Sequence, residues 1–534
     1  MKLKHASLHG SLLTLSLTLS AIVNAGVLSE QQTASPWFTD AQSNIEQKLL
    51  QKNTNRAKNV ILFVGDGMGI STLTAARILQ AQKKGELGEE SLLSFESFPF
   101  SALVKTYNVD AQTPDSAGTM TAMASGIKTD KGVIGLDEDA NYSDCNSAKG
   151  NDVVTALELA EISGLSTGVI STARITHATP AATYAKSANR NWEDISDMDG
   201  VENKEKCEDI ASQLINFESN LESRYPGIDV NGIDVVMGGG RRHFLPKDAQ
   251  FNLEKSVTDD PEGDRNDGRH LINEWQAQYE QGRFLTNQAD FDALDTDVSE
   301  PVFALFNESH MQYEANRGED IGGEPSLSEM TQKAIEVLRN NDKGFFLTVE
   351  SGRIDHGHHA GNAYNALEDT IELSKAVQLA IESTNPEDTL ILVTADHSHV
   401  MTMAGYPKRG NPILGKVISV GETEPELAED GTPYTTLGYA NGLGFMDLAD
   451  QSNADEGYDH ADTHGIHIGR ADLTLVDTTA PGFHQEATVP LGSETHAGED
   501  ITLHAKGPGA HLAQGVMEQS NVFHIIQQAL GLNK

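Results

Sequence analysis

The sequence is poor in positive charge. It carries 38 lysines and arginines against 79 aspartates and glutamates, a formal net charge of −41 over 534 residues. A field of that sign repels nucleic acids and anionic membranes, so we expect the chain to bind neither. With 38% hydrophobic and 22% charged residues, the composition is that of a globular protein with one or two large cores. It excludes a disordered tail protein and a disulfide-stapled miniprotein.

Cysteine is nearly absent, because Cys145 and Cys207 are the two that the sequence contains. Two cysteines cannot build a thiolate zinc cluster, so any bound metal must be held by histidine and carboxylate side chains. The residues alone leave open whether the two thiols form a disulfide or stay unpaired.

Long apolar runs are missing as well. No segment beyond the N-terminus has about 18 uninterrupted apolar residues, the length that crosses a membrane as a helix. The N-terminus has Lys2 and Lys4, a short apolar stretch at 12–23 and small residues up to Ala25. This pattern predicts a signal peptide over residues 1–25, and therefore an exported, periplasmic or secreted product without a membrane anchor. Export would permit a disulfide.

Short apolar runs alternate with helical patterns along the rest of the chain, and no internal repeat is present. This alternation predicts an α/β fold with a central, largely parallel sheet that is flanked by helices on both faces. The candidate strands are rich in β-branched residues, as expected for strands that are buried on both sides. They are residues 60–64, 167–172, 233–237, 345–349 and 389–394.

Helices and irregular segments lie between these strands. The expected helices span 71–84, 152–164 and 326–340. Asp152 is expected to cap the second, and Ser326 with Glu329 to form a capping box at the start of the third. Residues 405–490 lack a clean period and predict an insertion at one end of the sheet, within one catalytic domain over 26–534. Residues 259–297 are also irregular, and we expect them on the surface.

Acidic and imidazole side chains follow the first, fourth and fifth predicted strands. They are Asp66, Glu350, Asp355, Asp396 and His397. The carboxyl ends of parallel strands share one edge of a sheet, where ligands gather, so we expect these side chains to lie together. Histidine and carboxylate without cysteine is the ligand set of hydrolytic zinc sites.

The sharpest local pattern is the sequence DHGHH at 355–359. If a helix begins here, Asp355 and His359 lie on one face and can chelate a single ion. His356 and His358 then point elsewhere, and we expect them to support the ligands or to face solvent.

Ser116 opens a segment of small residues, 119–125, that is compatible with a helix. A serine in that place is by default a helix N-cap. The functional alternative is a nucleophile whose alkoxide is stabilised by the helix N-terminus and by an adjacent metal ion.

Three other patterns fail as binding motifs. Residues 65–69 (GDGMG) have their last glycine one position too early for a dinucleotide motif, and Asp66 would face an anionic pyrophosphate. Residues 238–240 are three glycines without the Lys-Ser/Thr of a phosphate-binding loop. The histidines of the insertion are expected to lie in a solvated loop; they are His460, His464 and His467.

Six stretches of the sequence together resemble those of the alkaline phosphatase family. The matching segments occur in the family's order over most of the chain, and they are residues 64–69, 113–119, 189–192, 349–359, 394–399 and 494–500. The resemblance implies an enzyme that hydrolyses phosphate monoesters to an alcohol and inorganic phosphate through a phosphoserine on Ser116.

The resemblance also implies two zinc ions and one magnesium ion. The implied ligands of the first zinc are Asp355, His359 and His496. Those of the second are Asp66, Asp396 and His397, with Ser116 able to bind it in the free enzyme. Those of magnesium are Asp66, Thr179 and Glu350. Arg190 would clamp the phosphate, because a planar guanidinium matches two phosphate oxygens.

Further details follow from the same resemblance. Cys145 and Cys207 stand where the animal-type branch has a disulfide, and residues 405–490 resemble the crown insertion through which family members pair as homodimers. His177 stands beside the magnesium pocket, as in the animal-type branch, and would weaken that site because it replaces a carboxylate. Asn307 lacks the charge of the glutamate in the family's calcium site, so we expect no fourth metal there.

Two alternatives to a phosphomonoesterase remain. One is a phosphodiesterase or sulfatase of the same superfamily; Ser116 lacks the sulfatase pattern Cys/Ser-x-Pro-x-Arg, and diesterases commonly have a threonine nucleophile and no counterpart of Arg190. The other is a non-catalytic exported protein that binds phosphate or metal, which would need neither Ser116 nor an open zinc position.

Overall fold

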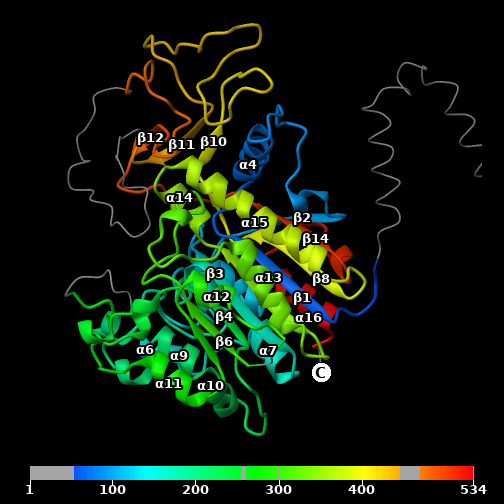
Figure 1. Cartoon of the computed structure of the whole chain (residues 1–534), viewed down its shortest axis with the longest axis vertical. Coiled ribbons are helices and arrows are strands. Elements are labelled where there is room, and N and C mark those ends of the chain that lie inside the picture. The colour runs from blue at the N-terminus through cyan, green and yellow to red at the C-terminus, as the bar shows by residue number, and fades with distance from the viewer. Residues whose placement is uncertain (1–52, 254–259, 298–299, 445–469, 533–534) are drawn as a thin grey trace, which may run out of the picture. The chain divides into compact units, whose positions relative to one another are not determined.

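A large mixed sheet forms the centre of the computed structural model, which describes residues 53–253, 260–297, 300–444 and 470–532 (Figure 1). In spatial order its ten strands are β15 (Gly515–Glu518), β2 (Phe100–Lys105), β14 (Ile501–Lys506), β8 (Thr389–Ala395), β1 (Asn59–Gly65), β7 (Phe345–Ser351), β3 (Ser166–Arg174), β4 (Val235–Gly239), β6 (Val302–Leu305) and β5 (Arg283–Leu285). Neighbouring strands run parallel except at β14, which is antiparallel to both β2 and β8. The predicted α/β fold is confirmed, and each of the five predicted strands corresponds to one of β1, β3, β4, β7 and β8.

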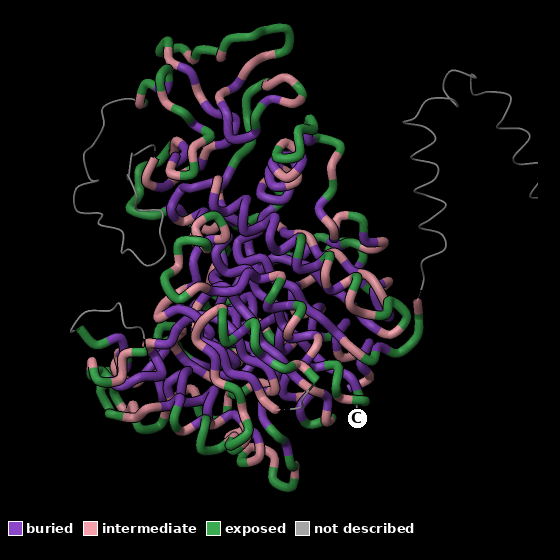
Figure 2. The backbone as a smooth tube through the Cα atoms, viewed as in Figure 1, coloured by how far each residue is buried: buried purple, intermediate pink, exposed green. Residues whose placement is uncertain are grey.

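The central strands are buried on both faces. All seven residues of β7 and all seven of β8 are buried. Figure 2 shows that buried residues fill the middle of the molecule. Successive side chains of a strand point to opposite faces. Helices therefore cover both sides of the sheet. The helices of the described residues are α4 (Ile70–Gln82), α5 (Ser116–Ser125), α6 (Cys145–Ala148), α7 (Ala156–Ile162), α8 (Ala178–Ala181), α9 (Ile210–Ile215), α10 (Phe217–Arg224), α11 (Leu271–Gln278), α12 (Gln288–Asp292), α13 (Leu327–Leu338), α14 (Arg353–His359), α15 (Ala363–Ser383) and α16 (Asn521–Leu530). Among the described residues, no helix combines the length and apolarity that a membrane crossing requires.

The predicted helix starts are partly right. The Ser326–Glu329 capping box is confirmed at the start of α13. The cap at Asp152 is wrong, because α7 begins at Ala156 behind a capping box of Thr155 and Glu158. Asp152 instead pairs across an isolated β-bridge.

The two irregular stretches have different outcomes. Residues 259–297 are not simply a surface segment, because they contain α11, the edge strand β5 and α12, and they bury Trp275 and Phe291. The described parts of 405–490 include β11 (Leu437–Gly442) and β12 (Ala487–Pro490), which form a small sheet with β10 (Met401–Met403). The signal peptide and the three insertion histidines lie outside the described residues.

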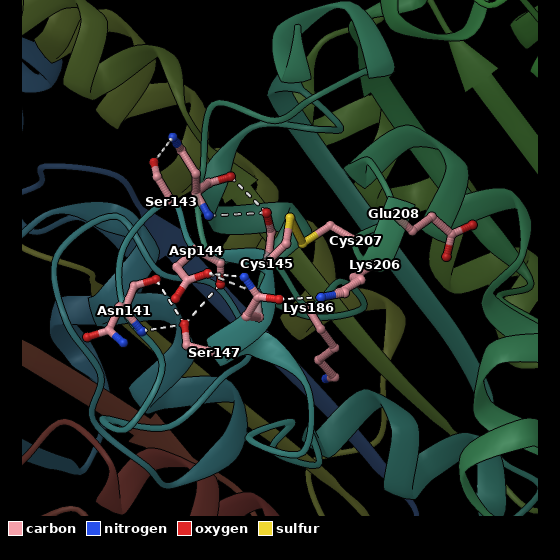
Figure 3. The surroundings of a disulfide bond; sticks show 12 residues. Asn141, Ser143, Asp144, Cys145, Ser147, Lys186, Lys206, Cys207 and Glu208 are labelled. Carbon is pink, nitrogen blue, oxygen red and sulfur yellow. Dashed lines mark hydrogen bonds between the residues drawn. A yellow bond between two sulfur atoms is a disulfide. The ribbon is translucent and has the colours of Figure 1, made fainter. Parts of the chain in front are cut away.

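Cys145 and Cys207 form a disulfide, which decides the alternative that the residues alone left open (Figure 3). The bond joins positions 62 residues apart in the sequence. Cys145 lies in a second, small hydrophobic core, separate from the main one. The other buried members of this core are Val133, Leu136, Ala140, Ala188, Trp192 and Met198. Because Arg190 lies between Ala188 and Trp192, this core anchors the segment that carries Arg190.

Candidate active site

The ends of β1, β7 and β8 lie level with one another at one edge of the sheet. Val64 of β1 is in register with Glu350 of β7, and Gly65 is in register with Ala395 of β8. Asp66 and Asp396 therefore leave adjacent strands at the same height. Glu350 lies in β7 itself, and α14 starts two residues after that strand ends.

One group of side chains surrounds Ser116. The Nε2 atom of His397 is 3.3 Å from Asp66 Oδ1, 3.3 Å from Asp396 Oδ2 and 3.2 Å from the Ser116 hydroxyl. All four residues are buried. Ser116 is the first residue of α5, but the N-cap is Asp115, whose carboxylate accepts a hydrogen bond from the Gly118 amide. The hydroxyl of Ser116 is thus left for the site.

A second group is centred on Asp355, in α14. Its Oδ1 atom is 3.4 Å from Nε2 of His359 and 3.4 Å from Nε2 of His496, and these two nitrogens are 3.1 Å apart. The other ring nitrogen of each histidine contacts a backbone carbonyl, at Glu494 for His359 and at Pro114 for His496. Since each Nδ1 then carries the proton, both Nε2 lone pairs face the shared position as metal ligands would.

A third group lies around Asp66 and Glu350, and the ring of His177 offers a nitrogen within 4.8 Å of their carboxylates. Asp66 Oδ2, Thr179 Oγ1 and Glu350 Oε1 are buried without a hydrogen bond of normal geometry from the described residues. The second carboxylate oxygen of Glu350 accepts a hydrogen bond from Ser171. Buried oxygens without partners are costly, and hard oxygen ligands are what magnesium prefers. The residues present therefore fit a bound hard cation.

The carboxylates of the site raise one another's pKa. Burial, followed by the charges of Asp396 and Asp355, raises the pKa of Asp66 well above its usual range. Burial and the same two neighbours raise the pKa of Glu350 to about 8. Burial alone would also raise the pKa of Asp355, but the histidines around it hold that pKa well below its usual value. Acids packed this closely need cations to stay ionised together.

Arg190 approaches the same site from its own loop. Its Nη1 donates to Asp115 Oδ2 at 3.0 Å, and its Nη2 donates to Nε2 of His177 at 3.0 Å. Burial and the nearby guanidinium of Arg190 lower the pKa of His177 to about 3, so the ring is neutral and can accept this bond. The family resemblance implied a place for His177 beside a magnesium site, and in the structure the ring also contacts Arg190. His356 accepts a hydrogen bond from Arg353.

Sequence reasoning missed His399 and Glu494. His399 Nε2 lies 2.7 Å from Asp355 Oδ1, and its Nδ1 contacts the Glu494 carboxylate. Burial lowers the pKa of His399, but Glu494 and Asp355 outweigh it and raise that pKa to about 10. Both residues lie two positions from expected ligands, His399 after His397 and Glu494 before His496, and that spacing is the signal that could have found them.

Gly67 allows this packing. Its φ is +69°, and a Cβ atom placed there would lie 2.3 Å from the His399 ring. The Gly67 amide donates to Asp396 Oδ1 at 2.9 Å. A glycine is thus required at position 67, because the His399 ring approaches closely and because the turn there holds Asp396.

A buried serine lies beside clusters of histidine and carboxylate side chains at the carboxyl edge of a mostly parallel sheet. This arrangement defines a metal-binding α/β enzyme. The family model described as alkaline phosphatase matches residues 57–532. The human tissue-nonspecific alkaline phosphatase is 40% identical over 515 residues, which cover 96% of this chain and 91% of that protein. The alkaline phosphatase of Gadus morhua is 38% identical over 516 residues, 96% of this chain and 100% of that protein. The chain belongs to the alkaline phosphatase family.

Solved structures agree on the fold. The alkaline phosphatase of Thermus thermophilus has a TM-score of 0.61 at 21% identity, covering 95% of this chain and 96% of that chain. The enzyme from the Antarctic bacterium TAB5 has a TM-score of 0.58 at 21% identity, covering 90% and 100%. The resemblance that the motifs predicted is confirmed.

Proposed function

We propose that this alkaline phosphatase hydrolyses phosphate monoesters with Ser116 as the nucleophile. The observation that carries the proposal is the position of the Ser116 hydroxyl, free of capping at the start of α5 and 3.2 Å from Nε2 of His397. Ser116 Oγ loses its proton and forms a bond to phosphorus while the bond from phosphorus to the alcohol oxygen breaks, and the alcohol leaves with a proton. Water then cleaves the phosphoserine, which releases inorganic phosphate and restores the serine.

The three groups of ligands have separate proposed occupants. Asp355, His359 and His496 would hold one zinc ion; Asp66, Asp396 and His397 would hold a second. Asp66, Thr179 and Glu350 would hold magnesium. When bound, these ions supply Lewis-acid stabilisation for the attacking and leaving oxygens. Imidazoles and carboxylates support zinc in the first two positions, and the oxygens of Asp66, Thr179 and Glu350 support magnesium in the third.

The proposed role of Arg190 is to hold two phosphate oxygens. Asp115 and His177 each accept one of its hydrogen bonds, and so they orient the guanidinium. The positive charge of three divalent ions and Arg190 would exceed the negative charge of the four ligand carboxylates, which are Asp66, Glu350, Asp355 and Asp396. An anionic substrate is therefore attracted locally, although the chain has a net charge of −41.

We further propose that residues 1–25 direct export and that residues 405–490 pair two chains as a homodimer. Exposed apolar side chains of that segment support the pairing, since Tyr406 is 85% exposed and Val420 81% exposed. A mass from light scattering equal to that of one chain would contradict it.

The test of the function is turnover of p-nitrophenyl phosphate at alkaline pH, compared with bis-p-nitrophenyl phosphate and p-nitrophenyl sulfate. We expect fast hydrolysis of the monoester alone, lost with EDTA and restored by zinc and magnesium. Preference for the diester or the sulfate would favour the related hydrolases. A folded, zinc-loaded chain without turnover would favour a binding protein.

A further inference from the structure

Glu193 joins the two segments that carry Arg190 and His177. One carboxylate oxygen, Oε1, accepts a hydrogen bond from Nη2 of Arg174 at 2.6 Å. The other, Oε2, accepts from Nε of Arg174 at 2.8 Å and from the Thr176 hydroxyl at 2.6 Å. Only 10% of the Glu193 side chain is exposed.

These partners belong to different parts of the chain from Glu193 itself. Arg174 is the last residue of β3, and Thr176 directly precedes His177 in the turn into α8. Glu193 follows Arg190 by three residues. The two segments meet a second time where Arg190 Nη2 donates to His177 Nε2. The position of the guanidinium thus depends on how the two segments are fixed against each other.

The contact between Glu193 and Arg174 is rigid. Burial raises the pKa of Glu193, but Arg174 and His243 outweigh burial and bring that pKa below its usual range. Glu193 is therefore an anion at every pH at which the enzyme works. Two parallel hydrogen bonds between a guanidinium and a carboxylate fix both distance and orientation. Nε2 of His243, 3.2 Å away, supports the same carboxylate from η4 (Arg241–Phe244).

We propose that Glu193 is a positioning residue for phosphate binding, which fixes the His177 segment against the Arg190 segment and so directs the Arg190 guanidinium. This inference rests on the proposed function of Arg190. Glu193 acts through Arg190 and does not itself contact the phosphate.

The test is Glu193→Gln, which keeps the size of the side chain but removes its charge and one acceptor oxygen. On the zinc-loaded full chain we expect KM and the inhibition constant of inorganic phosphate to rise about tenfold, with kcat changed less than about threefold. Zinc content should equal that of the parent chain. An unchanged inhibition constant would overturn the proposal.

A double-mutant cycle separates positioning from general damage. If Glu193 acts through Arg190, adding Glu193→Gln to Arg190→Ala should weaken phosphate binding no further. Independent, additive losses would overturn the proposal. Thr176→Val, which removes one hydrogen bond of Glu193 at nearly constant volume, should raise the inhibition constant in the same direction by less. This variant keeps the proposal testable if Glu193→Gln does not fold.

The matched control is Glu96→Gln, which weakens a comparably buried ion pair, that of Glu96 with Arg77. These two residues lie in η1 (Ser94–Ser97) and α4, outside the elements that hold Glu193. It should lower the unfolding temperature and leave the phosphate inhibition constant unchanged. Failure of this inference is distinguishable from failure of the proposed function. In the first case Arg190→Ala weakens phosphate binding and Glu193→Gln does not; in the second the parent chain itself does not turn over the monoester.

Discussion

At the level of single residues, the site depends on Asp115, and not Ser116, being the N-cap of α5. Asp115 accepts hydrogen bonds from the amides of Gly118 and Gly132 and from Arg190. The desolvation of its carboxylate would raise its pKa, but Arg190 and the two amides hold it below the usual value. Asp115 thus remains ionised, caps the helix and orients the arginine, which leaves Ser116 available as a nucleophile.

Ser116→Ala tests the nucleophile. Turnover of the monoester should fall by at least about 1,000-fold, because the atom that bonds to phosphorus is gone. Zinc content and unfolding temperature should stay close to those of the parent chain. Labelling with radioactive phosphate should give a phosphoprotein with the parent chain and none with the variant. Loss of zinc together with activity would show that the serine is structural.

Arg190→Ala tests the phosphate clamp. Charged hydrogen bonds contribute about 1.5–3 kcal/mol each, so phosphate inhibition should weaken about 10- to 100-fold. Arg190→Lys should recover little of this, since a lysine cannot make two parallel hydrogen bonds. Metal content, measured by atomic emission, should not change. A variant with the inhibition constant of the parent chain would contradict the role.

At the scale of elements, the disulfide and its small core hold the loop that presents Arg190. Trp192 and Cys145 belong to that core, and the backbone amide of Arg190 donates to Gly132 O at 2.8 Å. Lys206, the neighbour of Cys207, donates a hydrogen bond to Asn146, the neighbour of Cys145. The loop is thus anchored by packing, by a covalent bond and by hydrogen bonds.

Cys145→Ala combined with Cys207→Ala tests that anchor. Because the cysteines are 62 positions apart, loop-closure entropy predicts a loss of about 4 kcal/mol in the free energy of unfolding. Urea denaturation measures the loss, with the parent chain in reductant as the matched control. The reduced parent should unfold at the same urea concentration as the variant. A variant as stable as the oxidised parent would contradict the prediction.

At the scale of the whole molecule, the buried acids connect metal binding to stability. Three carboxylates with raised pKa values, Asp66, Glu350 and Asp396, lie in one site. Without cations they are favoured in their protonated form, and ionising them inside the protein costs free energy.

Metal removal should therefore make stability depend on pH. The pKa of Glu350 is about 8 in the folded metal-free chain against an ordinary value of 4.5. A raised pKa stabilises the folded state below pH 4.5, and that contribution is lost as pH rises to about 8. The unfolding temperature of EDTA-treated protein should fall over this range relative to that of metal-loaded protein.

Glu350→Gln is the control for this pH dependence. Its metal-free form should lose less stability over the same range, because a group that must ionise is gone. If metal-free and metal-loaded protein show parallel profiles, the interpretation is wrong.

The amino-acid sequence was enough to predict the α/β class, the five central strands and the family. These features rest on local information: runs of β-branched residues mark buried strands, and the motifs occupy contiguous stretches. The sequence left the other strands of the large sheet unpredicted, which are β2, β5, β6, β14 and β15. Four of them are partly exposed and β6 has four residues, so they lack long runs of buried side chains. The sequence also misplaced the start of α7, because Asp152 and Thr155 are both good caps.

No local sequence pattern predicts which distant side chains meet. His359 and His496 are 137 residues apart, yet their Nε2 atoms lie 3.1 Å from one another; the family resemblance implied this pair and the cysteine pairing. The contacts of His399 with Asp355 and the junction of two segments at Glu193 come from the folded structure alone. The physical reason is that local propensity acts over a few residues, whereas these contacts follow from the packing and strand order of the folded chain.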